Sequence, residues 1–105
     1  MISDLSHKEF QEYISKDNVI LLDVREPEEL EVCIINGAIN TPMSSIEEKY
    51  IDLDPSANFA LYCHHGMRSM RVANLLSSKS FESIVNLKGG IDAWSIEIDS
   101  SVERY

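Results

Sequence analysis

Residues 58–69, NFALYCHHGMRS, place a buried strand, a cysteine and the start of a helix in one short stretch. The first five residues are apolar or aromatic enough for a strand that is covered by other elements. From Met70 to Lys79 the apolar residues recur at helical spacing. Gly66 permits a tight turn between the two, because it has no Cβ. The stretch therefore predicts a strand, a loop that begins at Cys63, and a helix.

Cys63 is the residue of this loop that has the chemistry of a nucleophile. The first amides of a helix have no partner within the helix, so they point toward the loop and favour a thiolate over a thiol. His64, His65 and Arg68 add groups that favour negative charge. Cys33 has apolar neighbours instead, and a free cysteine in such a setting behaves as a small core residue. We therefore predict that Cys63 is reactive and partly exposed, and that Cys33 is structural.

The length and the charge limit what the chain does. It has 105 residues, of which 44% are hydrophobic, which predicts one globular domain over residues 1–105. The formal net charge is −9, a surface that repels nucleic acid and anionic membranes. Two distant cysteines make no disulfide framework, and residues 1–20 contain charges and no apolar run. We expect a cytoplasmic protein with neither a nucleic-acid partner nor a membrane partner.

Strand-like and helix-like segments alternate along the whole chain. Strands are expected from Ile2 and over 19–24, 38–40, 58–62 and 83–87, with helices at about 6–16, 26–31, 44–50, 70–79 and 91–94. This alternation predicts an α/β sandwich with a mostly parallel central sheet and helices on both faces. Ligands of such sheets bind at the carboxyl ends of the strands.

Local signals refine two helix starts and the end of the chain. Ser6 and Glu9 have the spacing of a capping box, and so do Ser44 and Glu47. Residues 97–105 are mostly polar and are expected to form a tail.

Asp23 and Arg25 follow the apolar run of the second strand. A carboxylate at the end of a buried strand requires hydrogen bonds or a cationic partner, so a supporting role is expected for Asp23. Arg25 has two interpretations from its position alone, as a residue at the mouth of the pocket or as the partner of a surface carboxylate.

The pattern Cys-x-x-Gly-x-Arg-Ser at 63–69 resembles the active-site loop of the rhodanese, or sulfurtransferase, family. Three further segments resemble that family in the same chain order: LDVREP at 22–27, NGAINTP at 36–42 and LKGGIDAW at 87–94. The matches cover nearly all of the chain. It departs from the family at Cys33-Ile34, where members often have Gly-His, so the local structure there must be held differently.

The resemblance implies a rhodanese-like fold and a sulfurtransferase. In that family a cysteine, here Cys63, takes sulfur from thiosulfate or a related donor as a persulfide and passes it to a thiophilic acceptor. The residues that would bind substrate are His64, His65, Gly66, Met67, Arg68 and Ser69, with Asp23 and Arg25 in support. The partners implied are a small sulfur donor and a thiol or cyanide acceptor, with a sulfur-relay protein as a further candidate. No cofactor is expected.

Three alternatives remain beside this interpretation. Cys63, His64 and His65 suggest a metal site, but three adjacent residues do not readily converge on one ion, so no metal is expected. An enzyme similar to phosphatases and arsenate reductases would use a Cys-x-x-x-x-x-Arg loop, whereas here four residues separate Cys63 from Arg68. A non-catalytic binding module is the third alternative, and the presence of Cys63 counts against it.

Overall fold

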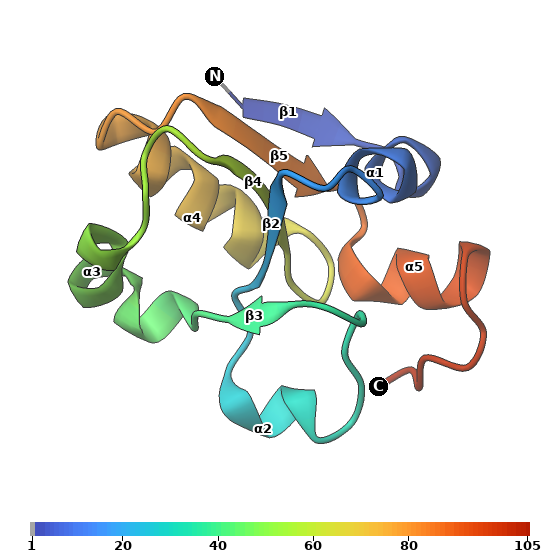
Figure 1. Ribbon diagram of the computed structural model, residues 1–105. Helices are drawn as coiled ribbons and strands as arrows, with labels where there is room; N and C mark the ends of the chain where they lie inside the picture. Colours follow the sequence, from blue (N-terminus) through green and yellow to red (C-terminus); the bar gives the residue numbers. More distant parts are fainter. Residues whose placement is uncertain (1) are drawn as a thin grey trace.

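The computed structural model describes residues 2–105, in which five strands form one sheet (Figure 1). The strands are β1 (Ile2–Leu5), β2 (Val19–Asp23), β3 (Ile39–Asn40), β4 (Asn58–Tyr62) and β5 (Ser83–Leu87). Their order is β1-β5-β4-β2-β3, and every pair of neighbours is parallel. The helices are α1 (His7–Ile14), α2 (Pro27–Leu30), α3 (Ile46–Lys49), α4 (Met67–Ser78) and α5 (Gly90–Glu97), and short 3₁₀ turns flank α3 at Met43–Ser45 and Tyr50–Asp52. The expected α/β class and parallel sheet are confirmed.

Helices cover both faces of the sheet, because successive residues of each central strand point to opposite sides. On one side Phe59 and Leu61 of β4 belong to a buried cluster with residues of α3 and α4. On the other side Ala60 and Tyr62 belong to a second cluster with residues of α1 and α5. This explains why β4 reads as a continuous apolar run instead of an alternating one.

The strand order brings the residues that follow β2 and the residues that follow β4 to the same edge of the sheet. Strands β2 and β4 are neighbours, and Asp23 is in register with Tyr62. Both strands end there, so Arg25 and Cys63 follow at the same edge of the sheet. The site is therefore placed at the carboxyl ends of adjacent parallel strands, as expected for this class.

One of the two predicted capping boxes is correct. At α1, the Ser6 hydroxyl accepts from the Glu9 amide and the Glu9 carboxylate accepts from the Ser6 amide. At α3 the prediction was wrong, because the chain is already in a 3₁₀ turn and the Ile46 amide donates to the Met43 carbonyl. A first turn with such a partner has less need of a capping side chain, and Ser44 donates its hydroxyl to Glu26 instead.

Two predicted boundaries also differ from the structure. Helix α4 begins at Met67, three residues before the predicted start, because Gly66 makes the turn in a left-handed conformation and serves as the N-cap. Residues 97–105 are not a free tail. Helix α5 extends to Glu97, and Ile98 and Val102 then pack against the α1/α5 core. Among the helices of residues 2–105, none has the length and the apolar character that crossing a bilayer requires.

Candidate active site

Cys63 follows β4 directly, and its sulfur faces the start of α4. Sγ accepts hydrogen bonds from the Gly66 amide at 3.1 Å, the Ser69 amide at 3.3 Å and the Ser69 hydroxyl at 3.3 Å. The Ser69 hydroxyl also lies 3.3 Å from the Gly66 carbonyl, so its single proton is shared between two acceptors. A sulfur surrounded by three donors is arranged to carry negative charge.

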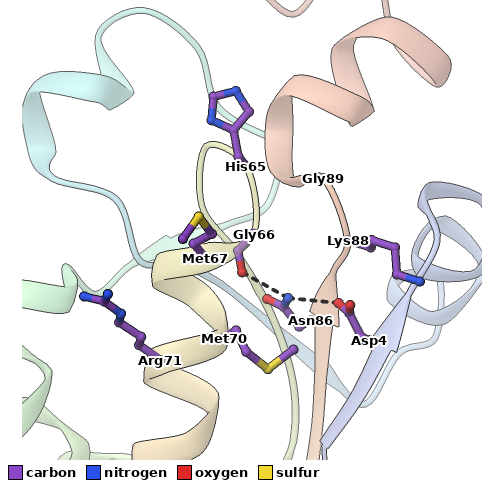
Figure 2. Close-up of a pocket in the computed structure, with 9 residues that line it drawn as sticks. All are labelled: Asp4, His65, Gly66, Met67, Met70, Arg71, Asn86, Lys88 and Gly89. Carbon is purple, nitrogen blue, oxygen red and sulfur yellow. Dashed lines mark hydrogen bonds between the residues drawn. The ribbon is translucent and has the colours of Figure 1, made fainter.

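Asn86 of strand β5 holds Gly66 in its conformation (Figure 2). Gly66 has φ of +101°, a region that favours glycine. The side-chain amide of Asn86 donates to the Gly66 carbonyl at 3.3 Å and to the Asp4 carboxylate at 3.0 Å. The loop is therefore tied to both β5 and β1, and its donors are held toward the sulfur before any ligand arrives.

The first turn of α5 holds the other side of the loop. The Ile91 amide donates to the Cys63 carbonyl at 2.8 Å, and the Asp92 amide donates to the His64 carbonyl at 3.1 Å. A Cβ at Gly90 would overlap the backbone of Cys63 and His64. Gly90 thus allows the two backbones to touch, and this contact positions the loop that begins at Cys63.

The Cys63 sulfur adjoins a pocket of about 310 Å³. Its lining residues are Cys63, His64, His65, Met67, Arg68 and Arg71. Met67 and Arg68 are the first two residues of α4, so the start of this helix forms part of the pocket wall. Cys63 itself is only 1% exposed, so the expectation of a partly exposed thiol was wrong. The residue lies at the bottom of the pocket, where it is covered by the loop and α4.

A second pocket of about 410 Å³ adjoins the first and shares His65, Met67 and Arg71 with it. Figure 2 shows its lining residues: Asp4, His65, Gly66, Met67, Met70, Arg71, Asn86, Lys88 and Gly89. The Met67 side chain lies between the two pockets and is largely exposed.

Arg68 points to α2 and not freely into the pocket. Its two terminal nitrogens donate to the two carboxylate oxygens of Glu29 at 2.6 and 2.8 Å. The bidentate pair holds the pKa of Glu29 down at about 2, and the same contact raises the pKa of Arg68. Arg68 therefore contributes a fixed positive group to the wall of the pocket.

Asp23 and Arg25 form a buried ion pair behind the loop. Both side chains are almost fully shielded from solvent, and Nη2 of Arg25 lies 2.6 Å from Oδ2 of Asp23. Arg25 lies neither at the mouth of the pocket nor on a surface carboxylate, so both interpretations of its position were wrong. The pair is placed to support the site instead of touching a ligand.

The same arginine explains the departure at Cys33-Ile34. Nη2 of Arg25 donates to the Cys33 carbonyl at 2.7 Å, and the Tyr62 hydroxyl accepts from the Ile35 amide at 3.1 Å. These two contacts hold the segment where the family often has Gly-His. Cys33 is buried, and burial raises the pKa of its thiol. Its environment is that of an unreactive cysteine.

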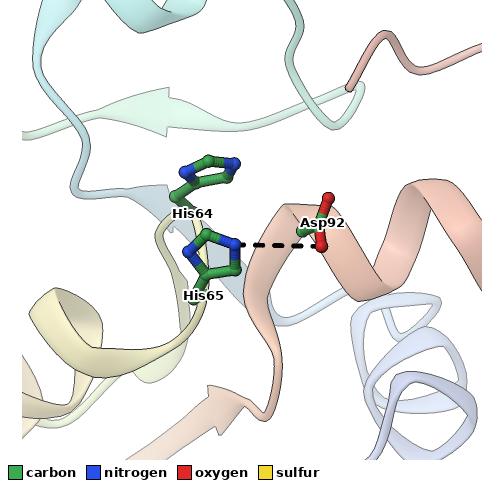
Figure 3. A group of neighbouring side chains, drawn as sticks. All are labelled: His64, His65 and Asp92. Carbon is green, nitrogen blue, oxygen red and sulfur yellow. Dashed lines mark ion pairs between the residues drawn. The ribbon is translucent and has the colours of Figure 1, made fainter. Parts of the chain in front are cut away.

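His64, His65 and Asp92 form a cluster at the mouth of the loop (Figure 3). The metal-ligand atoms of the three side chains lie within 4.8 Å of one another. The Asp92 carboxylate is already paired with Arg104 at 3.0 Å and lies 3.8 Å from Nε2 of His65. The two imidazole rings are tilted by 35° with 3.9 Å between their centroids. The absence of a metal stays a prediction.

The structure brings five of the predicted loop residues to one pocket: Cys63, His64, His65, Met67 and Arg68. Gly66 lines the second pocket, Ser69 is buried against the Cys63 sulfur, and Asp23 and Arg25 lie behind the loop. Sequence reasoning missed Glu29, which looked like part of a solvated acidic face, and Asn86, which lies in an apolar strand. It also missed Tyr105, whose ring stacks on His64 at 3.8 Å and 4°. The only sequence signals were a polar residue inside a buried strand and a single aromatic residue in a polar segment.

Comparison with known proteins supports this architecture. The family profile described as "Rhodanese-like domain" matches residues 6–97. YtwF of Bacillus subtilis, whose name describes a candidate sulfurtransferase, is 37% identical over 97 residues, which are 91% of this chain and 93% of that protein. The thiosulfate sulfurtransferase GlpE of Coxiella burnetii is 30% identical over 94 residues, which are 90% of this chain and 88% of that protein.

Two further relatives extend the comparison. A rhodanese-related protein from Thermoplasma volcanium has a crystal structure that superimposes with a TM-score of 0.83 at 34% identity, covering 91% of this chain and 93% of that chain. The rhodanese-like/PpiC domain-containing protein 12 of Arabidopsis thaliana is 36% identical over 103 residues, which are 94% of this chain. The chain spans only 34% of that larger relative.

Proposed function

Because this chain belongs to the rhodanese-like domain family, we propose that it is a sulfurtransferase that carries sulfur as a persulfide on Cys63. The observation that carries the proposal is the set of three donors, from Gly66 and Ser69, that surround Sγ. Relatives of similar length that are named sulfurtransferases support the same class. We propose thiosulfate or a related anion as the donor.

In the first half of the reaction, the Cys63 thiolate attacks the outer sulfur of thiosulfate. A bond forms between Sγ and that sulfur, the S–S bond of thiosulfate breaks, and sulfite leaves with the electron pair. The new outer sulfur carries the negative charge into the pocket beside the start of α4, where a helix N-terminus favours an anion. Arg71 is an exposed cation at the wall of this pocket and favours binding of the anionic donor, and Glu29 holds Arg68 in place at the same wall.

In the second half, an acceptor attacks the outer sulfur. Cyanide forms thiocyanate, whereas a thiolate acceptor forms a new persulfide, and in both cases the Sγ–S bond breaks and Cys63 returns as a thiolate. The Gly66 and Ser69 donors stabilise the thiolate as it leaves. The protein therefore alternates between two covalent states, which is a ping-pong scheme.

A phosphatase is less consistent with this site. Phosphoryl transfer needs a cation that binds the phosphate oxygens during in-line attack. Here the loop is one residue shorter than Cys-x-x-x-x-x-Arg, which leaves less room for the ring of donors and for the in-line approach of phosphate. We expect no meaningful hydrolysis of aryl phosphates. Phosphatase turnover that disappears in Cys63→Ser would refute the sulfurtransferase.

Intact-mass measurement after incubation with thiosulfate tests the proposal. The wild type should gain the mass of one sulfur atom and lose it on addition of cyanide. Cys63→Ser should gain nothing. Cys33→Ser is the matched control and should gain sulfur as the wild type does. Sulfur that maps to Cys33, or no addition in the folded wild type, would show the proposal to be wrong.

A further inference from the structure

The segment 99–105 returns from the end of α5 to the reactive loop. In Figure 1 the C-terminus lies near α2 and the chain that follows it, far from the N-terminus. Two contacts anchor this segment along its course. The Ser95 hydroxyl donates to the Val102 carbonyl at 2.5 Å, and Arg104 donates to Asp92 at 3.0 Å. These two contacts therefore hold Tyr105 beside the Cys63 loop.

The ring of Tyr105 fixes the plane of one residue that lines the Cys63 pocket. It stacks on His64 with 3.8 Å between centroids and 4° between planes. His65 contacts His64 at 3.9 Å between centroids. Burial lowers the pKa of His64, and its neighbour His65 lowers it further, which favours the neutral imidazole. A neutral aromatic ring stacks on tyrosine without losing hydration of a charge.

The hydroxyl of Tyr105 reaches a second residue of the pocket wall through Glu29. It donates to Oε2 of Glu29 at 2.6 Å and accepts from Nη1 of Arg25 at 3.0 Å. Burial and the contact with Glu29 raise the pKa of Tyr105 to about 12, so the hydroxyl keeps its proton at neutral pH. Glu29 in turn binds Arg68 with both oxygens. A continuous chain of hydrogen bonds thus runs from the buried Arg25 to Arg68.

We propose that Tyr105 is a positioning residue for the sulfur donor, because its hydroxyl fixes Arg68 through Glu29 and its ring fixes His64. The inference rests on the proposed function and adds a determinant of donor binding to it. Tyr105 does not line the pocket, so it acts through residues that do. The donors of Sγ come from Gly66 and Ser69, which Tyr105 does not contact, so the chemical step is separate from this chain of contacts.

The test is a steady-state comparison of wild type with Tyr105→Phe, which keeps the stack and loses the hydroxyl. We expect the KM for thiosulfate to rise roughly three- to tenfold, because the variant loses the hydrogen bond to Glu29 and the one from Arg25, with kcat within about twofold. Tyr13→Phe is the matched control, because Tyr13 shares a hydrogen bond with Ser83 away from the site and its loss should leave KM unchanged. An unchanged KM in Tyr105→Phe would overturn the proposal.

A double-mutant cycle with Arg68→Ala separates positioning from a general structural effect. If Tyr105 acts through Arg68, then adding Tyr105→Phe to Arg68→Ala should change KM no further. A full additional rise in KM would mean that Tyr105 acts by another route, and the proposal would be wrong. Tyr105→Ala, which also loses the stack on His64, should raise KM more than Tyr105→Phe does.

A structural readout keeps this test separate from that of the proposed function. Side-chain NMR of the Arg68 guanidinium should show restricted motion in the wild type and greater motion in Tyr105→Phe. If the wild type forms no persulfide, the proposed sulfur transfer fails while the NMR comparison still decides the positioning. If persulfide forms but Arg68 is equally restricted in both proteins, the positioning fails and the sulfurtransferase stands.

Discussion

Among single residues, Gly90 is important because it has no side chain. It has φ of +62°, and a Cβ there would overlap the backbone of Cys63 and His64. Gly37 has φ of +90°, but no atom lies within 4 Å of where its Cβ would be. The two glycines share the same backbone restriction and differ only in the space around them.

Gly90→Ala is therefore predicted to cost more stability than Gly37→Ala. The left-handed conformation should cost about 1–2 kcal/mol in either variant. Overlap with the loop should add about 1–3 kcal/mol in Gly90→Ala alone and reduce persulfide formation. Urea unfolding of both variants measures the difference. Equal losses of stability would mean that the contact between the α5 turn and the loop is unimportant.

Glu29 provides a prediction about pH. The pKa of Glu29 in the folded protein is about 2 because Arg68 binds it, below the ordinary value of 4.5. A lowered pKa contributes stability above pH 4.5, and that contribution is lost as pH falls toward 2. The gap in unfolding free energy between wild type and Glu29→Gln should therefore be present at about pH 7 and shrink by about pH 3.

Urea unfolding at several pH values measures this gap. Glu28→Gln is the control, because Glu28 lies on the exposed side of the same short helix and makes no ion pair with another described residue. A gap for Glu29→Gln that stays constant down to about pH 3 would contradict the pairing with Arg68.

The role of a residue in the site could be predicted from the sequence only where a local pattern indicated it. Cys63 and Gly66 stood out because a thiol and a glycine followed a buried strand. Glu29 and Tyr105 did not, because their importance comes from contacts over 39 and 76 residues of chain, which leave no local spacing. Arg25 could be located at a strand end, but its burial could not be inferred from that position.

At the scale of elements, the length of the loop between β4 and α4 sets the geometry around the sulfur. Gly66 and Ser69 lie three and six residues after Cys63, and both donate to Sγ. The interval is short enough that the helix start and the sulfur are in direct contact. One more residue would move Ser69 away from Cys63 or distort the first turn of α4.

Insertion of one glycine after Met67 should therefore reduce the rate of persulfide formation by about tenfold or more, since it removes preorganised donors. Mass spectrometry at early times measures the rate. Insertion of a glycine after Ser56, in the exposed turn before β4, is the control and should leave the rate nearly unchanged. An insertion at Met67 that is tolerated without loss would contradict the role of the Ser69 donors.

Element type was predictable for much of the chain, and the errors have physical causes. The bounds of β4 and β5 were correct because both strands are mostly apolar and each is bounded by polar or turn-forming residues. The cap of α3 failed because a preceding 3₁₀ turn supplied the partner that a serine usually provides. The prediction of a tail at residues 97–105 was wrong because Ile98 and Val102, which pack against the α1/α5 core, are two isolated apolar residues with no periodicity.

At the scale of the whole molecule, the net charge of −9 contrasts with the basic residues at the pocket. The acidic surface should oppose the approach of an anionic donor, whereas Arg68 and Arg71 act only at short range. Salt screens charges beyond about 8–10 Å, so it should weaken the repulsion more than the local attraction.

Moderate salt should consequently raise the second-order rate constant for thiosulfate slightly, by less than about twofold. Single-turnover persulfide formation across a salt series, with mixed sodium and potassium chloride as an ion control, measures it. A steep fall with salt would mean that long-range attraction governs the encounter.

The pairing of β1 with β5 also determines how early the chain can complete its fold. Ile2 is in register with Ile84, so the sheet closes across nearly the whole polypeptide. Such distant pairing is slow to form, because the entropy of ordering the intervening chain is lost before any contact compensates for it. During synthesis β1 cannot pair until β5 has been made. The amides of Ile91 and Asp92, which hold the Cys63 loop, are made later still.

The contacts that hold the Cys63 loop should therefore form last, together with the global fold. Stopped-flow refolding should give the same rate whether it is followed by Trp94 fluorescence or by protection of Cys63 from a thiol reagent. Protection that precedes the fluorescence change would mean that the loop is organised by its own sequence. A ribosome-bound chain that still lacks β5 and α5 would also lack the amides of Ile91 and Asp92, so the loop around Cys63 would not yet be held in its final geometry.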